Sequence, residues 1–213
     1  MKTSKEIFET LYASYPALVP CRAGIEKAYT ALLDCARAEG TVLVCGNGGS
    51  AADSEHIVGE LMKGFNLKRP LTPEEKALFT GVSGGEEIAD KLQRGIRAVS
   101  LVSQSGLITA FSNDIDPELI FAQQVFAYAQ KKEDVLIALS TSGNSKNVVN
   151  AAITAKATGI RSIAITGEKD SRLSAVSDVT VRLPAQTPFE VQELTLPVYH
   201  ALCAAIEADM FDK

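Results

Sequence analysis

The segment Cys45-Gly-Asn-Gly-Gly-Ser-Ala-Ala-Asp-Ser-Glu-His56 decides the fold. It follows a short apolar run, Thr41–Cys45, and leads into a stretch that we expect to be helical. An apolar strand that turns through glycines into a helix is typical of a parallel α/β sheet. Gly46, Gly48 and Gly49 allow a tight turn and a close approach of a ligand to the backbone.

Short apolar runs alternate with helices along the rest of the chain. The further predicted strands are Val99–Val102, Val135–Leu139, Arg161–Ile165 and Val179–Leu183. This order predicts an α/β fold with a five-stranded parallel sheet and right-handed crossovers. Ligands of such sheets bind beyond the carboxyl ends of the strands, so residues that directly follow a strand are the first candidates for a site.

Two amphipathic helices precede the first strand. Apolar side chains recur at helical spacing in residues 4–15 and in residues 21–39. Ser4 can cap the first helix, and Gly40 ends the second. Since no strand precedes them, we expect a helical hairpin that packs outside the sheet. Its outer faces are candidates for contact with a neighbouring subunit.

A polar segment, residues 66–97, interrupts the alternation of strands and helices. It is punctuated by proline and glycine and contains one predicted helix, Glu86–Arg97. A connection this long is a lid or an interaction element. We expect it to fold over or beside the site as an insertion in one domain, 1–213, whose N-terminal helices occupy 1–39.

Composition excludes several classes of protein. The 213 residues are 46% hydrophobic and 22% charged, which excludes disorder as the main state. The net charge of −5 argues against sequence-independent binding to nucleic acid. No apolar run approaches the roughly 20 residues that span a bilayer, and no signal peptide is evident. The four cysteines form no close pair, which favours a reducing cytoplasm.

Two loops are candidates for binding phosphate. Ser50 can cap the helix after the glycine-rich turn, and backbone N–H groups at a helix N-terminus favour an anion; a purely structural turn is the alternative. After the third strand, a helix is predicted to open near Asn144, and four hydroxyls surround one glycine. They belong to Ser140, Thr141, Ser142 and Ser145. This density favours phosphate over an ordinary serine-rich cap.

The chain has only two histidines, and each has an oxygen-bearing side chain at helical spacing. His56 and Glu60 stand four residues apart, a spacing that suits two ligands of one metal ion or an ordinary surface pair. His200 follows Gln192 by eight residues and Glu193 by seven, in a helix that begins near Phe189 and that Pro197 is predicted to kink. A packed core histidine is the alternative for His200.

Four motifs give the chain a clear resemblance to a known family. They are CGNGGSAADSEHIVGEL, FSNDIDPELIF, LSTSGNSKNVVNA and VQELTLPVYHALC, which with the strands between them span residues 41–205. In this order they resemble the sedoheptulose 7-phosphate (phosphoheptose) isomerases, a branch of the SIS (sugar isomerase) domain proteins. The resemblance implies a flavodoxin-like, doubly wound sheet and a homotetramer with sites between subunits.

The resemblance also implies the roles of individual residues. Zn²⁺, one ion per subunit, would be held by His56, Glu60, Gln192 and His200, and Glu60 and His200 would be the acid/base pair. The residues expected to contact the sugar phosphate are Asn47, Gly48, Gly49, Ser50, Glu60, Asn113, Asp114, Ser140, Thr141, Ser142, Ser145 and Gln192.

The expected reaction is aldose–ketose isomerisation through an enediol, from sedoheptulose 7-phosphate to glycero-manno-heptose 7-phosphate. The chain departs from the family near the site: the 66–97 segment is longer, Lys63 stands where an arginine is common, and Phe189 stands where an aspartate is common. These departures keep an isomerase of another phosphosugar open. A non-catalytic phosphosugar regulator or a tetrameric scaffold of the replication-initiator-binding type is the alternative.

Overall fold

The computed structural model describes residues 2–212 and is built around a parallel sheet. The strands are β1 (Val42–Cys45), β2 (Ala98–Ser100), β3 (Val135–Leu139), β4 (Arg161–Thr166) and β5 (Val179–Arg182). They lie in the order β2-β1-β3-β4-β5, which is that of a flavodoxin-like, doubly wound sheet, and the predicted fold class is confirmed. In this topology the chain reverses direction across the sheet between β1 and β3, where ligands bind.

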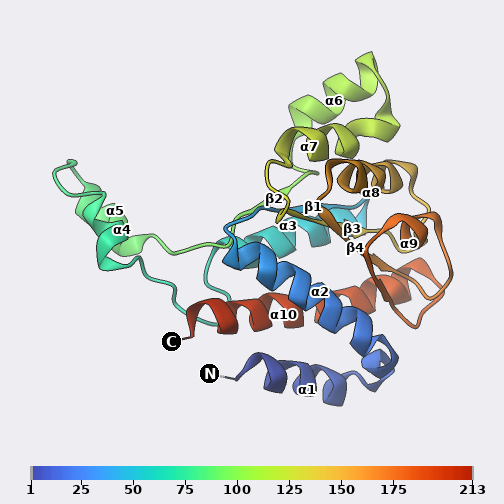
Figure 1. The fold of residues 1–213 in the computed structure, drawn as a ribbon, viewed down its shortest axis with the longest axis horizontal. Coiled ribbons are helices and arrows are strands. Elements are labelled where there is room, and N and C mark those ends of the chain that lie inside the picture. The colour runs from blue at the N-terminus through green and yellow to red at the C-terminus, as the bar shows by residue number, and fades with distance from the viewer. Residues whose placement is uncertain (1, 213) are drawn as a thin grey trace.

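The strands are apolar on both faces because each face meets a layer of helices. In β1, Val42 and Val44 belong to one core, and Leu43 and Cys45 to the other. Figure 1 shows the two layers. The first consists of α2 (Arg22–Arg37), α3 (Gly49–Met62) and α10 (Pro188–Phe211), and the second of α7 (Ile120–Tyr128), α8 (Lys146–Thr158) and α9 (Arg172–Val176).

Outside these layers lie α1 (Ser4–Ser14) and α6 (Ser105–Asp114), with the 3-10 turns η1 (Pro16–Cys21) and η2 (Pro117–Leu119) (Figure 1). The N-terminal helices differ from the prediction. α1 packs against α10 and is capped by Thr3, not Ser4. α2 packs directly on the sheet, where a Cβ on Gly24 would lie 2.7 Å from the Thr180 carbonyl oxygen of β5. The expectation that both helices lie outside the sheet is therefore wrong for α2.

Residues 71–92, called the arm below, leave the body of the molecule. They contain α4 (Pro73–Ala77) and α5 (Gly85–Lys91), which stand clear of the sheet layers (Figure 1). The predicted helix 86–97 ends at Lys91, because the following residues return as an extended strap in which Gln93 bridges to Pro70. Within this chain α4 and α5 stand away from α3 (Figure 1). The expectation that the 66–97 segment folds over or beside the site stays a prediction.

A buried ion pair fixes the root of the arm. Nε of Arg69 donates to Oε1 of Glu207 on α10 over 2.7 Å, and both side chains are fully buried. Glu207 also accepts the backbone N–H groups of Phe65, Asn66 and Leu67. The chain that leaves α3 is thereby held against α10 and turned away from the sheet.

Candidate functional site

The two predicted phosphate loops lie side by side at the carboxyl ends of β1 and β3. They are joined by a pair of amide hydrogen bonds, from Asn47 Nδ2 to Asn147 Oδ1 over 2.8 Å and from Asn147 Nδ2 to Asn47 Oδ1 over 2.9 Å. Asn147 lies in the first turn of α8 and was not singled out in the sequence, although it stands inside the serine-rich motif. The adjacent strands therefore present both loops at one point of the sheet edge.

In the glycine-rich loop the backbone makes the turn. Gly48 has a φ of +57° and is the residue that precedes the first turn of α3. Ser50 lies within that turn and does not cap the helix, so this detail of the prediction is wrong. The exposed face of Gly48 meets no atom within 4 Å of a built Cβ, which leaves room for a ligand.

The serine-rich loop leads into α8 without a side-chain cap at the N-cap position. α8 begins at Lys146, two residues after the predicted start, and its N-cap residue, Ser145, makes no side-chain cap hydrogen bond. Oγ of the buried Ser140 lies 3.2 Å from Oγ of Ser145, and Ser142 is exposed. Oγ of Ser142 accepts the backbone N–H of Asn144 over 3.2 Å, so one hydroxyl stabilises the turn, and phosphate binding by this loop stays a prediction.

α3 and α10 bring the two histidines together. Nε2 of His56 lies 3.2 Å from Oε1 of Glu60 and 3.4 Å from Nε2 of His200. The second carboxylate oxygen of Glu60 receives a hydrogen bond from Nζ of Lys63 over 3.1 Å. The alternatives of a lone surface pair for His56 and of an isolated core position for His200 do not describe this cluster.

Two residues that the sequence analysis did not select, Tyr199 and Asp53, contact the cluster through His56. The hydroxyl of the buried Tyr199 lies 2.9 Å from Nδ1 of His56 and 3.2 Å from Oδ1 of Asp53. Oδ2 of Asp53 is buried without a hydrogen-bond partner within residues 2–212. In the sequence Tyr199 is one more apolar position beside His200, and no local pattern indicates its contact with α3.

Burial sets the ionisation of these groups. It raises the pKa of Asp53, against the lowering effects of Tyr199, His56 and the nearby Gln192 amide. Burial also raises the pKa of Tyr199, which keeps its hydroxyl protonated. The pKa of His200 is lowered, first by burial and then by the charge of His56, while Glu60 acts in the opposite direction.

Gln192 contacts the glycine-rich loop. A Cβ built on Gly49 would lie 2.0 Å from Nε2 of Gln192 and 2.4 Å from its Oε1, so this amide occupies the space that a side chain at position 49 would take. Among residues 2–212, no group of three or more His, Cys, Asp or Glu side chains is arranged to hold a metal ion as it stands. Three of the predicted metal ligands, His56, Glu60 and His200, lie together in the histidine cluster, and the fourth, Gln192, lies against Gly49 and beside Asp53.

Within residues 2–212, no hydrogen bond or ion pair joins Asn113 or Asp114 to the two loops. Both residues lie at the exposed end of α6, in the outermost layer of Figure 1, where Nδ2 of Asn113 donates to Oδ1 of Asp114 over 2.8 Å. Their predicted contact with the sugar phosphate stays a prediction.

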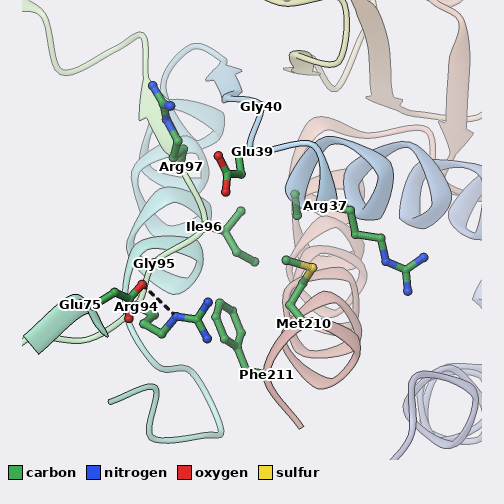
Figure 2. A pocket seen from close by; sticks show the side chains of 11 residues that line it. Arg37, Glu39, Gly40, Glu75, Arg94, Gly95, Ile96, Arg97, Met210 and Phe211 are labelled. Atoms are coloured by element: carbon green, nitrogen blue, oxygen red, sulfur yellow. Dashed lines mark hydrogen bonds and ion pairs between the residues drawn. The ribbon is translucent and has the colours of Figure 1, made fainter. Parts of the chain in front are cut away.

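A separate cavity of about 310 Å³ lies near the amino ends of β1 and β2 (Figure 2). Its arginines do not converge on one point: Arg94 pairs with Glu75 over 3.3 Å and lies beside Phe211, while Arg37 and Arg97 point away from the cavity. We therefore place the candidate site at the loops and the histidines.

None of the helices in the described part of the chain is long and apolar enough to cross a bilayer.

The chain matches two family models, both described as SIS domain, one over residues 98–206 and one over residues 21–96. A phosphoheptose isomerase of Helicobacter pylori is 34% identical over 182 residues, 85% of this chain and 82% of its own length. One of Laribacter hongkongensis is 31% identical, over 97% of this chain and 94% of its own. The solved structure of a phosphoheptose isomerase from Francisella tularensis aligns with a TM-score of 0.72 and 26% identity, covering 97% of this chain and 98% of its own.

Proposed function

As a member of the phosphoheptose isomerase branch of the SIS domain family, this chain is a phosphosugar isomerase, and we propose that it interconverts sedoheptulose 7-phosphate and glycero-manno-heptose 7-phosphate. The observation that carries the proposal is the position of α3. This helix begins at the glycine-rich loop and carries His56 and Glu60 to the same cluster as His200.

The two loops supply the anchor for the substrate's phosphate. The hydroxyls of Ser142 and Ser145 stand at the N-terminal end of α8, where free N–H groups and the helix dipole favour an anion. Binding energy at the phosphate then positions the reacting carbons of the sugar, which lowers the entropic part of the barrier.

The isomerisation moves a proton between C1 and C2, which requires a base and an acid. Glu60 is the base in the proposal, and its carboxylate is held by Lys63 on one oxygen and faces His56 with the other. His200 is the acid in the proposal, and burial and the charge of His56 lower its pKa. The enediol oxygens would be stabilised by hydrogen bonds and by positive charge in this cluster.

We also propose that a divalent ion, with zinc preferred, binds at the cluster. The donor atoms are of the kind that zinc takes, imidazole nitrogen and carboxylate oxygen. Neighbouring ligands of tetrahedral zinc, with bonds of about 2.0–2.1 Å, lie roughly 3.3 Å apart; the separations at Nε2 of His56 are 3.2 and 3.4 Å. His56, Glu60 and His200 would hold the ion, and Gln192 is the predicted fourth ligand. When bound, zinc would polarise the substrate carbonyl as a Lewis acid.

The assembly we propose is a homotetramer with sites between subunits. Support comes from apolar side chains that the arm exposes: Leu78 is 79% exposed, Val82 60% and Ile88 53%. Helices as short as α4 and α5 are marginal in water without packing partners. A second copy would cover this surface. Leu78→Ser with Ile88→Ser should therefore lower the sedimentation coefficient, whereas Ile153→Ser on α8 should not.

A panel of phosphosugars, assayed for isomerisation with and without added zinc, tests the proposed reaction. We expect the highest kcat/KM with sedoheptulose 7-phosphate and a loss of rate on chelation. A higher kcat/KM with a pentose or hexose phosphate would reassign the substrate. Tight binding of phosphosugars without turnover would favour the non-catalytic regulator.

A further inference from the structure

A groove of about 520 Å³ lies beside β2, the strand at one edge of the sheet. Apolar side chains contribute to its lining: Met62 at the end of α3, Val99 in β2 and Tyr128 at the end of α7. Met62 is 54% exposed and Tyr128 38%. Below, this surface is called the edge groove. Apolar side chains that are exposed together at a sheet edge are typical of a surface that another chain covers.

Two cations border the edge groove. Arg97 directly precedes β2, and Figure 2 shows its side chain pointing away from the 310 Å³ cavity. Within residues 2–212 this guanidinium has no ion pair or hydrogen bond. Nζ of Lys131 donates to the carbonyl oxygen of Glu39 over 2.9 Å and has no carboxylate partner in the described chain. Asp134 also lines the groove, but it is buried and accepts three backbone N–H groups.

The arm has the complementary surface, apolar and acidic. Four of its apolar side chains are 44–79% exposed, namely Leu78, Val82, Ile88 and Leu92. Its two lysines and the arginine that follows it are each paired with a carboxylate: Lys76 with Asp90, Lys91 with Glu87, and Arg94 with Glu75. Glu74 and Glu86 keep no ion-pair partner among the described residues. The arm therefore carries two free negative charges beside its apolar side chains, as the groove carries two cations beside its own.

The positions of the arm and the edge groove suit a reciprocal contact. The strap that returns from the arm leads through Ile96 into Arg97 and β2, so the groove lies next to the root of the arm. No residue of the described arm lines the groove of its own chain. A two-fold axis near this root would bring each arm to the groove of the other copy by a single rotation.

We propose that the arm of one subunit docks in the edge groove of a second copy of this chain, and that the second copy does the same in return. The exposed apolar side chains of the arm contact the apolar lining of the groove, and Glu74 and Glu86 lie near Arg97 and Lys131. The inference rests on the assembly proposed above and adds the surface that receives the arm. Because the exchange is reciprocal, it closes as a dimer, and two such dimers make the tetramer.

Cross-linking between two engineered cysteines tests the contact. The four natural cysteines are buried, so a flexible bismaleimide reacts first with an exposed engineered thiol. Chains with Ile88→Cys on the arm and chains with Tyr128→Cys in the groove carry different tags and are co-expressed. We expect a product with both tags, formed roughly 10²-fold faster than by random collision, because docking raises the effective concentration of the thiols to the millimolar range.

The matched control pairs Ile88→Cys with Ile153→Cys, an exposed apolar position on α8, and should react at the slow rate. Charge reversal sharpens the test. Glu74→Lys with Glu86→Lys should slow the reaction between arm and groove, and Arg97→Glu added to the groove chain should restore part of the rate.

Sedimentation of the same samples separates this inference from the proposals on which it rests. A tetramer that cross-links no faster at Tyr128 than at Ile153 would overturn the contact between arm and groove and leave the tetramer in place. A monomer would overturn both. Isomerase activity, measured on the untreated chains, is an independent readout and does not depend on either outcome.

Discussion

α10 carries two polar clusters that resemble each other in composition and differ in surroundings. Near its end, Glu207 binds Arg69, and both are fully buried with several backbone partners. Near its middle, His200 meets His56 and Glu60, with His56 42% exposed and Glu60 13% exposed. A buried pair with satisfied hydrogen bonds fixes the chain, whereas an accessible cluster with spare donors and acceptors can do chemistry. The comparison predicts that changes in the first cluster cost stability and that changes in the second cost activity.

The largest effect is expected for Glu207→Gln. The amide would leave the Arg69 charge buried without a counter-charge and set an N–H₂ group against backbone donors, so the free energy of unfolding should fall by about 3–5 kcal/mol. Denaturant unfolding measures it. The control is Asp34→Asn, which breaks the Arg161–Asp34 pair of 2.9 Å whose side chains are 53% and 48% exposed. That loss should stay within about 1 kcal/mol, and equal losses would end the distinction by burial.

The Arg69–Glu207 ion pair also shows which contacts cannot be predicted from the sequence. The strands, the helix after the glycine-rich segment and the helix near Phe189 follow from local periodicity, and the spacing of His56 and Glu60 follows from one helix. Arg69 and Glu207 stand 138 residues apart, and Tyr199 and His56 stand 143 apart. Such pairs depend on how α3 crosses α10, which no local pattern contains.

The two helix boundaries that were predicted wrongly have different causes, one local and one tertiary. Thr3 replaces Ser4 as the cap of α1 because Thr3 and Glu6 form a reciprocal capping box. The helix of the arm ends at Lys91 because Gly95 must pass Met62 closely: a Cβ there would lie 2.7 Å from the Met62 carbonyl oxygen. The approach of the strap to α3 is a tertiary contact, and it overrides the helical pattern of residues 92–97.

Glu60→Gln, in the cluster of His56, Glu60 and His200, should have the second largest effect, a loss of kcat. The amide keeps an oxygen but cannot take a proton, so kcat should fall by about 10²-fold or more even with zinc present. The free energy of unfolding should change little. Steady-state kinetics and denaturant unfolding on the same samples measure both. Glu193→Gln, an exposed position on α10, is the control and should leave kcat unchanged. A stable Glu60→Gln enzyme with normal kcat would contradict the assignment of the base.

Ser142→Ala, in the serine-rich loop, should have a smaller effect, a rise in KM. A lost hydrogen bond to a charged group is worth about 1.5–3 kcal/mol, so KM should rise roughly 10- to 100-fold with kcat less affected. Ser142 is exposed, so the unfolding midpoint should not move. Ser83→Ala, an exposed serine of the arm, is the matched control. An unchanged KM would make the serine-rich loop a structural turn.

The smallest effect concerns the pH dependence of stability in the metal-free protein. The folded-state pKa of His200 is lowered from 6.5, so between that lowered value and 6.5 the unfolded chain binds more protons than the folded one. Stability should therefore decrease as pH falls through this window and level off below the folded pKa. Asp53 has a raised pKa and contributes with the opposite sign, at pH values above its ordinary 3.8. The comparison of wild type with His200→Gln isolates the histidine.

Denaturant midpoints measured across this pH range, with a chelator present, should show a shallower dependence in His200→Gln than in the wild type. The exposed Arg161–Asp34 pair supplies the control: Asp34→Asn, which touches neither cluster, should keep the wild-type slope. A steeper slope in His200→Gln, or an NMR titration that places the pKa of His200 above 6.5, would mean that attraction to Glu60 outweighs burial. The middle of α10 would then resemble its buried end, with the histidine held as an ion-pair partner.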